Sequence, residues 1–297
     1  MGGIRSGLSG AGEIRHSLRE EGMTKTWFIT GAGRGLGEAF ARAALARGDK
    51  VAATARHLSA LQGLVDTHGE AVLPLILDVT DRTAAFEAVA KTRDKFGRLD
   101  VVVNNAGYGL FGAVEEITDQ ELRDQLEVNL FGALHVTQAA LPILRAQGGG
   151  HIVQISTIGG VAAFPNLGGY HASKWALEGL TEALAQEVAA FGIKVTLVEP
   201  GPYATDWAGS SAVHAAPKPE YAELHSGMAQ QASAMPAEFF GVAAAAGAAL
   251  LKVVDSEAPP LRVFFGVMPT QLVPDLYRAR VATWEQWKDL AVEAHGH

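Results

Sequence analysis

The chain has 297 residues, of which 48% are hydrophobic and 19% charged, and its formal net charge is −8. This length and composition predict a globular protein with a substantial core, and the negative charge argues against nucleic acid or an anionic membrane as partner. The absence of cysteine excludes disulfides, thiolate zinc sites and a cysteine nucleophile, and it fits a reducing, cytoplasmic location.

The first 22 residues combine several glycines with charges of both signs and have no apolar core. This is not the pattern of a secretory signal, so we expect a flexible tail over 1–22, with Met23 as an alternative start. A tail that docks on a partner is the other interpretation. We expect no membrane span, because the most apolar stretch, 241–251, is short and is followed by Lys252.

From Lys25 onward, short β-type runs alternate with longer helical patterns. This alternation predicts an α/β fold, in which helices cover both faces of a parallel sheet. Strands with apolar centres, as expected when both faces are buried, are predicted at 26–30, 50–55, 72–78, 99–107, 151–156, 194–201 and 261–267. Helices are predicted at 38–47, 81–96, 119–146, 170–191 and 236–254.

Two further segments stand apart from this alternation. Residues 202–235 are rich in Pro, Ala, Ser and His and lack periodicity, which predicts a long substrate loop or lid. A mobile insertion without a role is the alternative. Residues 270–297 form a C-terminal extension, and we interpret its Tyr277, Trp284 and Trp287 as packing residues of a final amphipathic helix. Covering a substrate cleft is the alternative role for these three side chains.

Glycines cluster directly after the first predicted strand, in Thr30-Gly31-Ala32-Gly33-Arg34-Gly35-Leu36-Gly37. A glycine-rich turn between a strand and a helix predicts a dinucleotide site. Gly31 allows the tight turn, while Gly35 and Gly37 let the backbone approach a pyrophosphate. The helix N-terminus adds free N–H groups and a partial positive charge. The spacing differs from the ordinary G-x-G-x-x-G fingerprint, and a simple turn is the alternative.

The second predicted strand ends at Ala55 and is followed by Arg56. A dinucleotide fold that selects NAD places a carboxylate at this strand end, where it binds the ribose 2′-hydroxyl. Here the carboxylate is missing and Arg56 offers a charged fork for a 2′-phosphate, with Arg34 approaching from the glycine turn. These residues predict a preference for NADP(H), with NAD(H) also usable. The alternative is that Arg56 is only a surface residue.

Ser156 ends the fifth predicted strand, and Tyr170 and Lys174 stand four residues apart in YHASK. Residues i and i+4 share a helix face, so the Lys174 ammonium can lie beside the Tyr170 ring. A nearby cation favours the phenolate and lowers the pKa of the phenol toward neutral pH. Ser156 can then hydrogen-bond a substrate oxygen. The three residues predict the proton transfer that accompanies a hydride transfer.

The motifs TGAGRGLG, NNAG at 104–107, Asn129, Ser156, YHASK and Pro200-Gly201 follow one another at characteristic spacings. In this ordered set the chain resembles the classical short-chain dehydrogenases/reductases (SDR) over residues 25 to about 267. It is most similar to their steroid- and retinol-dehydrogenase-like branch. The resemblance implies one doubly wound Rossmann-type catalytic domain over 23–297, and an NADP-dependent alcohol dehydrogenase or carbonyl reductase.

The resemblance also implies roles for single residues. Tyr170 would be the acid/base, Lys174 its pKa partner and a ribose ligand, and Ser156 the anchor of the carbonyl. Asn129 would hold a water that links Lys174 to solvent. Further cofactor contacts would come from Asp78, Val79, Asn105, Pro200 and Thr205. Asp78 could equally be a helix cap, and the turn at Asn105 could equally be structural.

The expected substrate is a small to medium, largely apolar carbonyl compound or alcohol. The apolar residues expected around the cleft are Tyr108, Phe111, Phe164, Leu167, Tyr203, Trp207, Met228 and Met235. Metal ligands are not expected, and all histidines, His171 included, are interpreted as solvent-facing.

We also expect a homodimer or homotetramer. Apolar residues cover much of the predicted helix 170–191, namely Trp175, Leu177, Leu180 and Leu184. Two other functions remain open: a non-catalytic nucleotide-binding regulator, and a lyase or epimerase that uses a bound dinucleotide.

Overall fold

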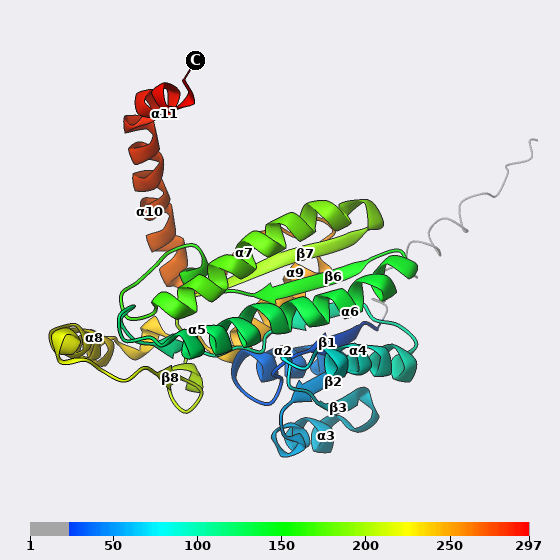
Figure 1. Cartoon of the computed structure of the whole chain (residues 1–297). Coiled ribbons are helices and arrows are strands. Elements are labelled where there is room, and N and C mark those ends of the chain that lie inside the picture. The colour runs from blue at the N-terminus through cyan, green and yellow to red at the C-terminus, as the bar shows by residue number, and fades with distance from the viewer. Residues whose placement is uncertain (1–23, 297) are drawn as a thin grey trace, which may run out of the picture.

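The computed structural model describes residues 24–296, so the tail expected at 1–22 and Met23 lie outside the described residues. Its centre is a seven-stranded parallel sheet in the order β3-β2-β1-β4-β6-β7-β9 (Figure 1). The strands are β1 Thr26–Ile29, β2 Lys50–Ala55, β3 Val72–Ile76, β4 Val101–Asn104, β6 Gly150–Ile155, β7 Ile193–Pro200 and β9 Arg262–Phe265. Each overlaps a predicted strand, although β6 and β7 begin one residue earlier than predicted, and the doubly wound Rossmann-type fold is confirmed.

Helices cover both faces of this sheet. On one face lie α2 (Gly35–Ala46), α3 (Gln62–His68) and α9 (Ala243–Asp255), which bury one hydrophobic core. On the other lie α4 (Arg82–Phe96), α6 (Gly132–Ala146) and α7 (Gly168–Val188), which bury the second. The core strands are apolar on both sides because each face is covered by helices.

The predicted helix 119–146 is helical throughout, but its middle is a π-helical segment and not an α-helix. It begins as α5 (Asp119–Leu126), which Thr118 and Glu121 open with a capping box. A π-helical segment, Glu127–Phe131, then precedes α6. A single π turn inside an α-helix often marks a functional site, because it turns side chains away from the regular face. The sequence could not show this, since a π turn leaves the apolar pattern almost unchanged.

The segment 202–235 is more ordered than the predicted loop. It contains a short strand, β8 (Val213–His214), which pairs with β5 (Leu110–Phe111), and a helix, α8 (Ala222–Ala234). None of the residues of α8 is buried. A helix that buries no face shows no apolar stripe in its sequence, which is why its periodicity was absent. The predicted helix 236–254 likewise begins late, at Ala243.

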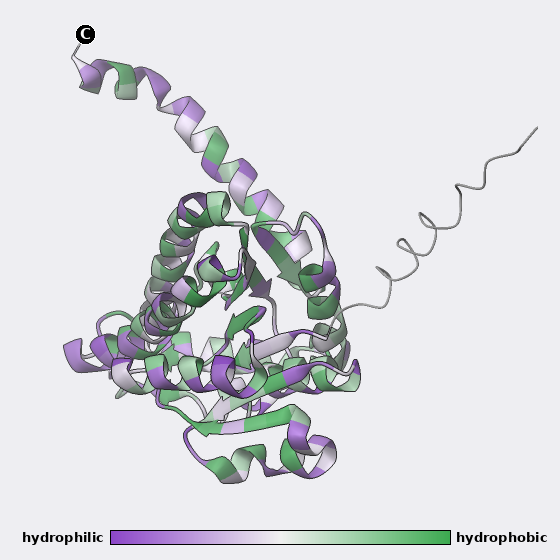
Figure 2. Ribbon diagram, turned by 90° about the vertical axis from the view of Figure 1, so that its right-hand side faces the viewer, coloured by the Kyte–Doolittle hydropathy of each residue, from purple (hydrophilic) through white to green (hydrophobic). Residues whose placement is uncertain are grey.

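The chain ends in two helices, α10 (Val267–Gln286) and α11 (Lys288–His295). Figures 1 and 2 show α10 rising away from the body of the protein, with α11 at its far end. Tyr277, Trp284 and Trp287 are 40%, 68% and 58% exposed, so their interpretation as packing residues is wrong. Only the base of α10, around Val273, packs into a hydrophobic cluster. No helix within residues 24–296 is long and apolar enough to cross a membrane.

Candidate functional site

The glycine-rich turn joins β1 to α2 at the C-terminal edge of the sheet. Gly31 and Gly35 have positive φ angles of 64° and 59°, which glycine adopts without steric cost. A Cβ atom on Gly37 would collide with the carbonyl oxygen of Gly31 and with Nδ2 of Asn105. The backbone is therefore packed as tightly as a turn without side chains allows.

Helix α2 begins inside this turn. Arg34 is its N-cap residue, in an extended conformation, and its side chain makes no capping hydrogen bond. Gly33 lies close to Ala60, and Leu36 packs against the core. The first N–H groups of a helix need partners, and together with the helix dipole they bind phosphate well. The residues present thus fit the pyrophosphate of a dinucleotide.

Asn105, at the end of β4, holds the glycine turn in place. Its Nδ2 donates to the carbonyl oxygens of Thr30 and Gly31 at 2.9 and 3.1 Å. The Thr30 hydroxyl in turn accepts hydrogen bonds from the backbone N–H groups of Asn105 and Ala106, both at 2.9 Å. Both donor bonds of the Asn105 amide thus go to the glycine turn. The structure therefore supports a role for Asn105 in holding this turn, the structural alternative given above.

Asn129 lies in the π-helical segment and is 1% exposed. Its side chain brackets the backbone of Tyr108, donating to the carbonyl oxygen at 3.0 Å and accepting from the N–H at 3.1 Å. The same amide donates to Ser173 Oγ at 3.0 Å, on α7. Asn129 therefore ties the loop after β4 to the helix that carries Tyr170 and Lys174.

Ser156, Tyr170 and Lys174 come together at this edge and are all buried, with exposed fractions of 4%, 6% and 6%. Ser156 directly follows β6, and the other two lie on the first turns of α7. Lys174 Nζ donates to the carbonyl oxygen of Ile155 at 2.8 Å and lies 6.0 Å from the centre of the Tyr170 ring. Among the described residues, Ser156 Oγ has no hydrogen-bond partner. An unpartnered buried hydroxyl suits an atom that binds a substrate oxygen.

The electrostatics of Tyr170 differ from the expectation. Burial raises the pKa of Tyr170 above its ordinary value, opposed by a hydrogen bond with Thr157. Burial lowers the pKa of Lys174 to about 8, although the charge of Glu178 acts against this. The expected lowering of the Tyr170 pKa by Lys174 is wrong for this structure. The ammonium is bound to a carbonyl oxygen, and the loss of water around the phenol has the larger effect.

Of the two arginines expected at the adenine ribose, Arg34 forms an ion pair within the protein, whereas Arg56 is exposed at the end of β2. Arg56 follows β2 and is exposed. The guanidinium of Arg34 instead contacts the Asp206 carboxylate at 3.2 Å and Ser210 Oγ at 3.3 Å. Both side chains of the Arg34–Asp206 pair are more than half exposed, at 55% and 51%. Such a pair contributes little to stability, so Arg34 can exchange partners easily.

Asp78 and Val79 follow β3 near the same edge. Asp78 accepts hydrogen bonds from the N–H and the hydroxyl of Thr80, at 3.0 and 2.7 Å. The cap of α4 is Asp81, not Asp78, so the alternative role of Asp78 as helix cap is wrong. Val79 is buried, and its carbonyl oxygen is 3.1 Å from Nδ1 of His135.

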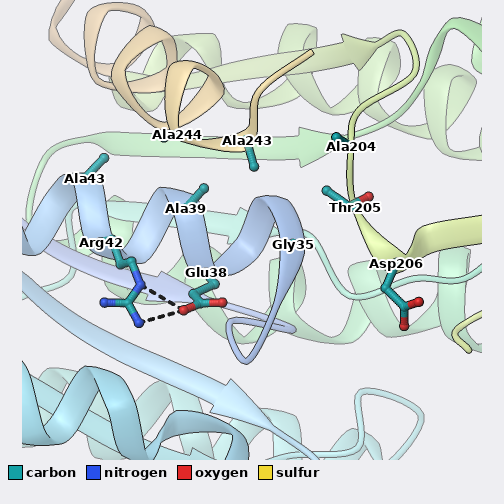
Figure 3. A pocket seen from close by; sticks show the side chains of 10 residues that line it. All are labelled: Gly35, Glu38, Ala39, Arg42, Ala43, Ala204, Thr205, Asp206, Ala243 and Ala244. Atoms are coloured by element: carbon teal, nitrogen blue, oxygen red, sulfur yellow. Dashed lines mark hydrogen bonds and ion pairs between the residues drawn. The ribbon is translucent and has the colours of Figure 1, made fainter. Parts of the chain in front are cut away.

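The chain after β7 folds over the catalytic edge. Pro200 ends β7, and Thr205 then lies next to Gly35, as Figure 3 shows at the mouth of a groove between α2 and α9. This groove has a volume of about 550 Å³. Beyond Thr205, the indole of Trp207 packs on the rings of Tyr170 and Phe111, with centroid distances of 5.0 and 5.5 Å.

The other apolar residues expected around the substrate cleft do not lie together in the structure. Leu167 bridges to Gly112, and Phe164 packs edge-on against His171. Tyr203 packs instead against the core on the α2 and α9 face, and Met235 is 39% exposed. Tyr108 and Met228 are half-buried.

Acidic residues tether the segment that carries α8. The buried carboxylate of Glu116 accepts from the N–H groups of Ala113 and Lys218 at 2.7 and 2.8 Å, and contacts His225 Nε2 at 2.9 Å. These contacts hold the pKa of Glu116 at about 2, the His225 hydrogen bond being the largest cause. The segment is therefore fastened beside β5.

Two histidines are buried, so the expectation that all of them face solvent is wrong. His171 is 4% exposed and accepts from the Phe164 N–H at 3.3 Å; His151 is 3% exposed and bonds Thr196 Oγ1 at 2.9 Å. Burial lowers the pKa of each to about 4. No group of three His, Asp or Glu side chains in the described chain is placed to hold a metal.

Sequence reasoning missed three charged residues behind Ser156. Glu178 on α7, Glu199 on β7 and Arg262 on β9 form a cluster, with Arg262 Nε 3.1 Å from Glu178 and 3.5 Å from Glu199. Two signals could have found it. Glu178 stands one turn after Lys174, and Glu199 is an acidic residue that directly follows the apolar run Leu197-Val198 of a predicted strand.

Comparison with known proteins identifies the architecture. The oxidoreductase BOA17 of Botryotinia fuckeliana is 43% identical over 271 residues, which covers 91% of this chain and 99% of that protein. A short-chain dehydrogenase from Streptomyces avermitilis has a similar structure, with a TM-score of 0.85, 39% identity, and coverage of 92% of this chain and 99% of that one.

An alcohol dehydrogenase from Thermococcus sibiricus, solved with 5-hydroxy-NADP, superimposes with a TM-score of 0.69 at 27% identity. It covers 82% of this chain and 96% of its own. The sequence profile of the short chain dehydrogenase family matches residues 25–215, well over half of the chain. The protein is therefore an oxidoreductase that belongs to the short-chain dehydrogenase family.

Proposed function

We propose that the protein interconverts an alcohol and a ketone or aldehyde by hydride transfer with NADP(H). The observation that carries this proposal is the buried set of Ser156, Tyr170 and Lys174 beside the glycine-rich turn. Ser156 Oγ has no partner within residues 24–296, as a carbonyl anchor requires. Asn129 connects the set to the loop after β4.

The bound nicotinamide would supply the hydride, and the chain would position the substrate and move the proton. Ser156 donates to the substrate oxygen, and the Tyr170 hydroxyl gives that oxygen its proton. The buried phenol keeps its proton at neutral pH, since burial raises its pKa. In this direction Tyr170 acts as a general acid. Lys174, with its pKa lowered to about 8, can return a proton to Tyr170.

Cofactor preference is proposed from the residues at the end of β2. Ala55 leaves the 2′-position without a carboxylate, and Arg56 is exposed there. The Thermococcus relative was solved with an NADP derivative, which supports NADP(H) binding in this fold. Gly31, Gly33, Gly35, Leu36 and Gly37 would hold the pyrophosphate, and Asp78, Val79, Asn105, Pro200 and Thr205 would flank the rest.

The substrate is proposed to be small to medium and largely apolar. Trp207 packs over Tyr170 and Phe111 packs against Trp207, and the two rings supply aromatic walls without charge. We further propose that residues 23–297 act as one catalytic domain, with 202–235 as the substrate lid, and that the protein is a homodimer or homotetramer. A cytoplasmic location stays a prediction from the sequence.

One experiment separates this function from its alternatives. The purified protein is incubated with NADPH or NADH and a panel of ketones, aldehydes and alcohols, and the reduced-nicotinamide absorbance is followed. A nucleotide-binding regulator would bind cofactor without consuming it. A lyase or epimerase would change the substrate, as mass spectrometry or chiral chromatography shows, without net consumption of cofactor. Net oxidation of NADPH by apolar ketones is the expected result.

A further inference from the structure

Behind Ser156 lies a group of acidic side chains that the proposed reaction does not use. Glu178 and Glu199 have side chains that are 7% and 1% exposed, and a single guanidinium, that of Arg262, faces both of them. Arg262 also pairs with Glu182 at 2.9 Å, which is 54% exposed. One cation thus serves three carboxylates, two of which are buried. Such a cluster is costly unless one of the buried carboxyl groups holds a proton.

Glu178 reaches the Ser156 hydroxyl across Gly160. A Cβ atom on Gly160 would collide with Ser156 Oγ and would lie 2.9 Å from Oε1 of Glu178, so both oxygens border the same small space. The Ser156 hydroxyl lowers the pKa of Glu178 but forms no hydrogen bond of ordinary geometry with it. Oε1 of Glu178 also lacks a partner among residues 24–296. Two unpartnered buried oxygens side by side are a natural acceptor–donor pair.

The charges around Glu178 come from every element that packs against it. Lys174 and Glu182 share its helix, Glu199 faces it from β7, and Arg262 from β9. Burial raises the pKa of Glu178, against the Ser156 hydroxyl and Arg262. The pKa of Glu199 is raised to about 8, first by burial and then by the charge of Glu178. Glu199 and Arg262 line a cavity of about 510 Å³.

We propose that Glu178 is a positioning residue for Ser156, and that its protonation state decides where the Ser156 hydroxyl donates. When Glu178 is ionised, its carboxylate accepts the Ser156 hydrogen, which is then lost to the substrate oxygen. When Glu178 is protonated, it donates to Ser156 Oγ and leaves the Ser156 hydrogen free for the substrate. Only a proton exchanged with solvent moves in this step. The role in catalysis rests on the proposed function, whereas the coupling of Glu178 to Ser156 does not.

The coupling is tested without cofactor or substrate. Protein labelled with ¹³C at the glutamate side-chain carboxyl carbons is titrated by NMR, and the Glu178 signal is assigned by its loss in Glu178→Gln. In Ser156→Ala the Glu178 carboxyl should titrate at higher pH, because a hydrogen bond to its charged form is gone. Thr157→Ser is the control and should leave that titration in place, since it keeps the hydroxyl that contacts Gly159 and Pro200. An unchanged Glu178 titration in Ser156→Ala overturns the proposal.

The consequence for catalysis is read from pH profiles. With NADPH and 2-octanone as probe, kcat/KM should fall about three- to tenfold as pH rises through the Glu178 titration measured by NMR, the value of one hydrogen bond. Glu178→Gln, which cannot ionise, should lose that limb, while Glu199→Gln should keep it. A limb that persists in Glu178→Gln at the pH of the Glu178 titration measured by NMR contradicts the positioning role. If no carbonyl probe is reduced, the proposed function fails, and the NMR titration still decides the Glu178–Ser156 coupling.

Discussion

The indole of Trp207 lies against the phenol of Tyr170, with ring centroids 5.0 Å apart and planes inclined by 56°. Trp207 belongs to the segment that follows β7, whereas Tyr170 stands on α7. A Cβ on Gly109 would lie 2.6 Å from the indole, so a third segment also confines the ring. The candidate acid is thus buried by a residue of the predicted lid.

Replacing Trp207 by alanine should weaken substrate binding and partly expose Tyr170. An aromatic pair contributes about 0.5–1.5 kcal/mol beyond its buried area, so KM for an apolar ketone should rise about two- to tenfold. The pKa of Tyr170, which burial raises, should move back toward its ordinary value. Steady-state kinetics and an ultraviolet titration of the phenol measure the two effects. Trp207→Phe should behave almost as wild type, and so should Trp284→Ala on the exposed α10.

Replacing Arg56 by aspartate should reverse the cofactor preference. A lost charge-assisted hydrogen bond costs about 1.5–3 kcal/mol, so the Kd for NADPH should rise about ten- to a hundredfold while NADH binds better. Arg278→Asp on α10 is the charge-matched control. Calorimetry with each cofactor gives the Kd values. Equal use of NADH and NADPH by the wild type would contradict the preference outright.

Asp206 offers a second test of the cofactor end. Its carboxylate forms an ion pair with the guanidinium of Arg34. Asp206→Asn removes the negative charge from this pair and should leave the guanidinium free to bind a 2′-phosphate. An exposed pair contributes about 0.2–1 kcal/mol, and NADPH should therefore bind up to about fivefold tighter, with NADH unaffected. The same calorimetric titrations measure this. Equal tightening of both cofactors would show that Arg34 does not contact the 2′-phosphate.

The sequence predicted the sheet well because its strands are apolar runs bounded by glycine and polar residues. Every predicted strand is in the sheet, and Lys174, beside Tyr170, reaches the end of β6 directly before Ser156. Parallel strands bring residues that are far apart in sequence to one edge. Properties that depend on the exclusion of solvent, such as the pKa of Tyr170, were less predictable. The direction of the Tyr170 pKa shift follows from burial of the phenol, to which Trp207 contributes, and no spacing in the sequence reveals that contact.

Low pH should loosen the segment around α8. The pKa of Glu116 is held at about 2, below its ordinary 4.5, so its contacts stabilise the closed segment above pH 4.5 and are lost as pH falls toward 2. The protection factors of residues 216–228, which compare measured exchange with the intrinsic rate at each pH, should fall across that window. Glu116→Gln should loosen the segment already at neutral pH, and Glu115→Gln, whose partners are exposed, should do so less. Protection factors that depend neither on pH nor on Glu116 would refute this tether.

Oligomerisation should be visible in solution. Of the apolar residues on α7, Leu177 and Leu184 are buried within the fold, whereas Trp175 and Leu180 stay 41% and 37% exposed. Light scattering should give two or four times the chain mass of 31.2 kDa. Leu180→Glu should shift the equilibrium toward monomer, and Leu58→Glu, exposed on another surface, should not. A mass of 31.2 kDa at micromolar concentration would contradict the expectation.

Other parts of the structure left no readable pattern in the sequence. The π turn at Asn129 changes hydrogen bonding but not composition. Helix α8 buries no residue and so carries no apolar stripe. Trp284 on α10 and Trp287 directly after it have the composition of a packed helix face, yet both are exposed, because they lie beyond Arg280, which still contacts Val161 of the body. In each case the missing information is tertiary: which surface, if any, the element meets.

The most direct test of the proposed reaction is the turnover of Tyr170→Phe, measured together with its NADPH affinity. If Tyr170 supplies the proton, the variant should bind NADPH like the wild type and lose about 10²- to 10⁴-fold in kcat, the usual contribution of a general acid. Tyr277→Phe on α10 should leave both quantities unchanged. Near-native turnover of Tyr170→Phe with intact NADPH binding would contradict the mechanism.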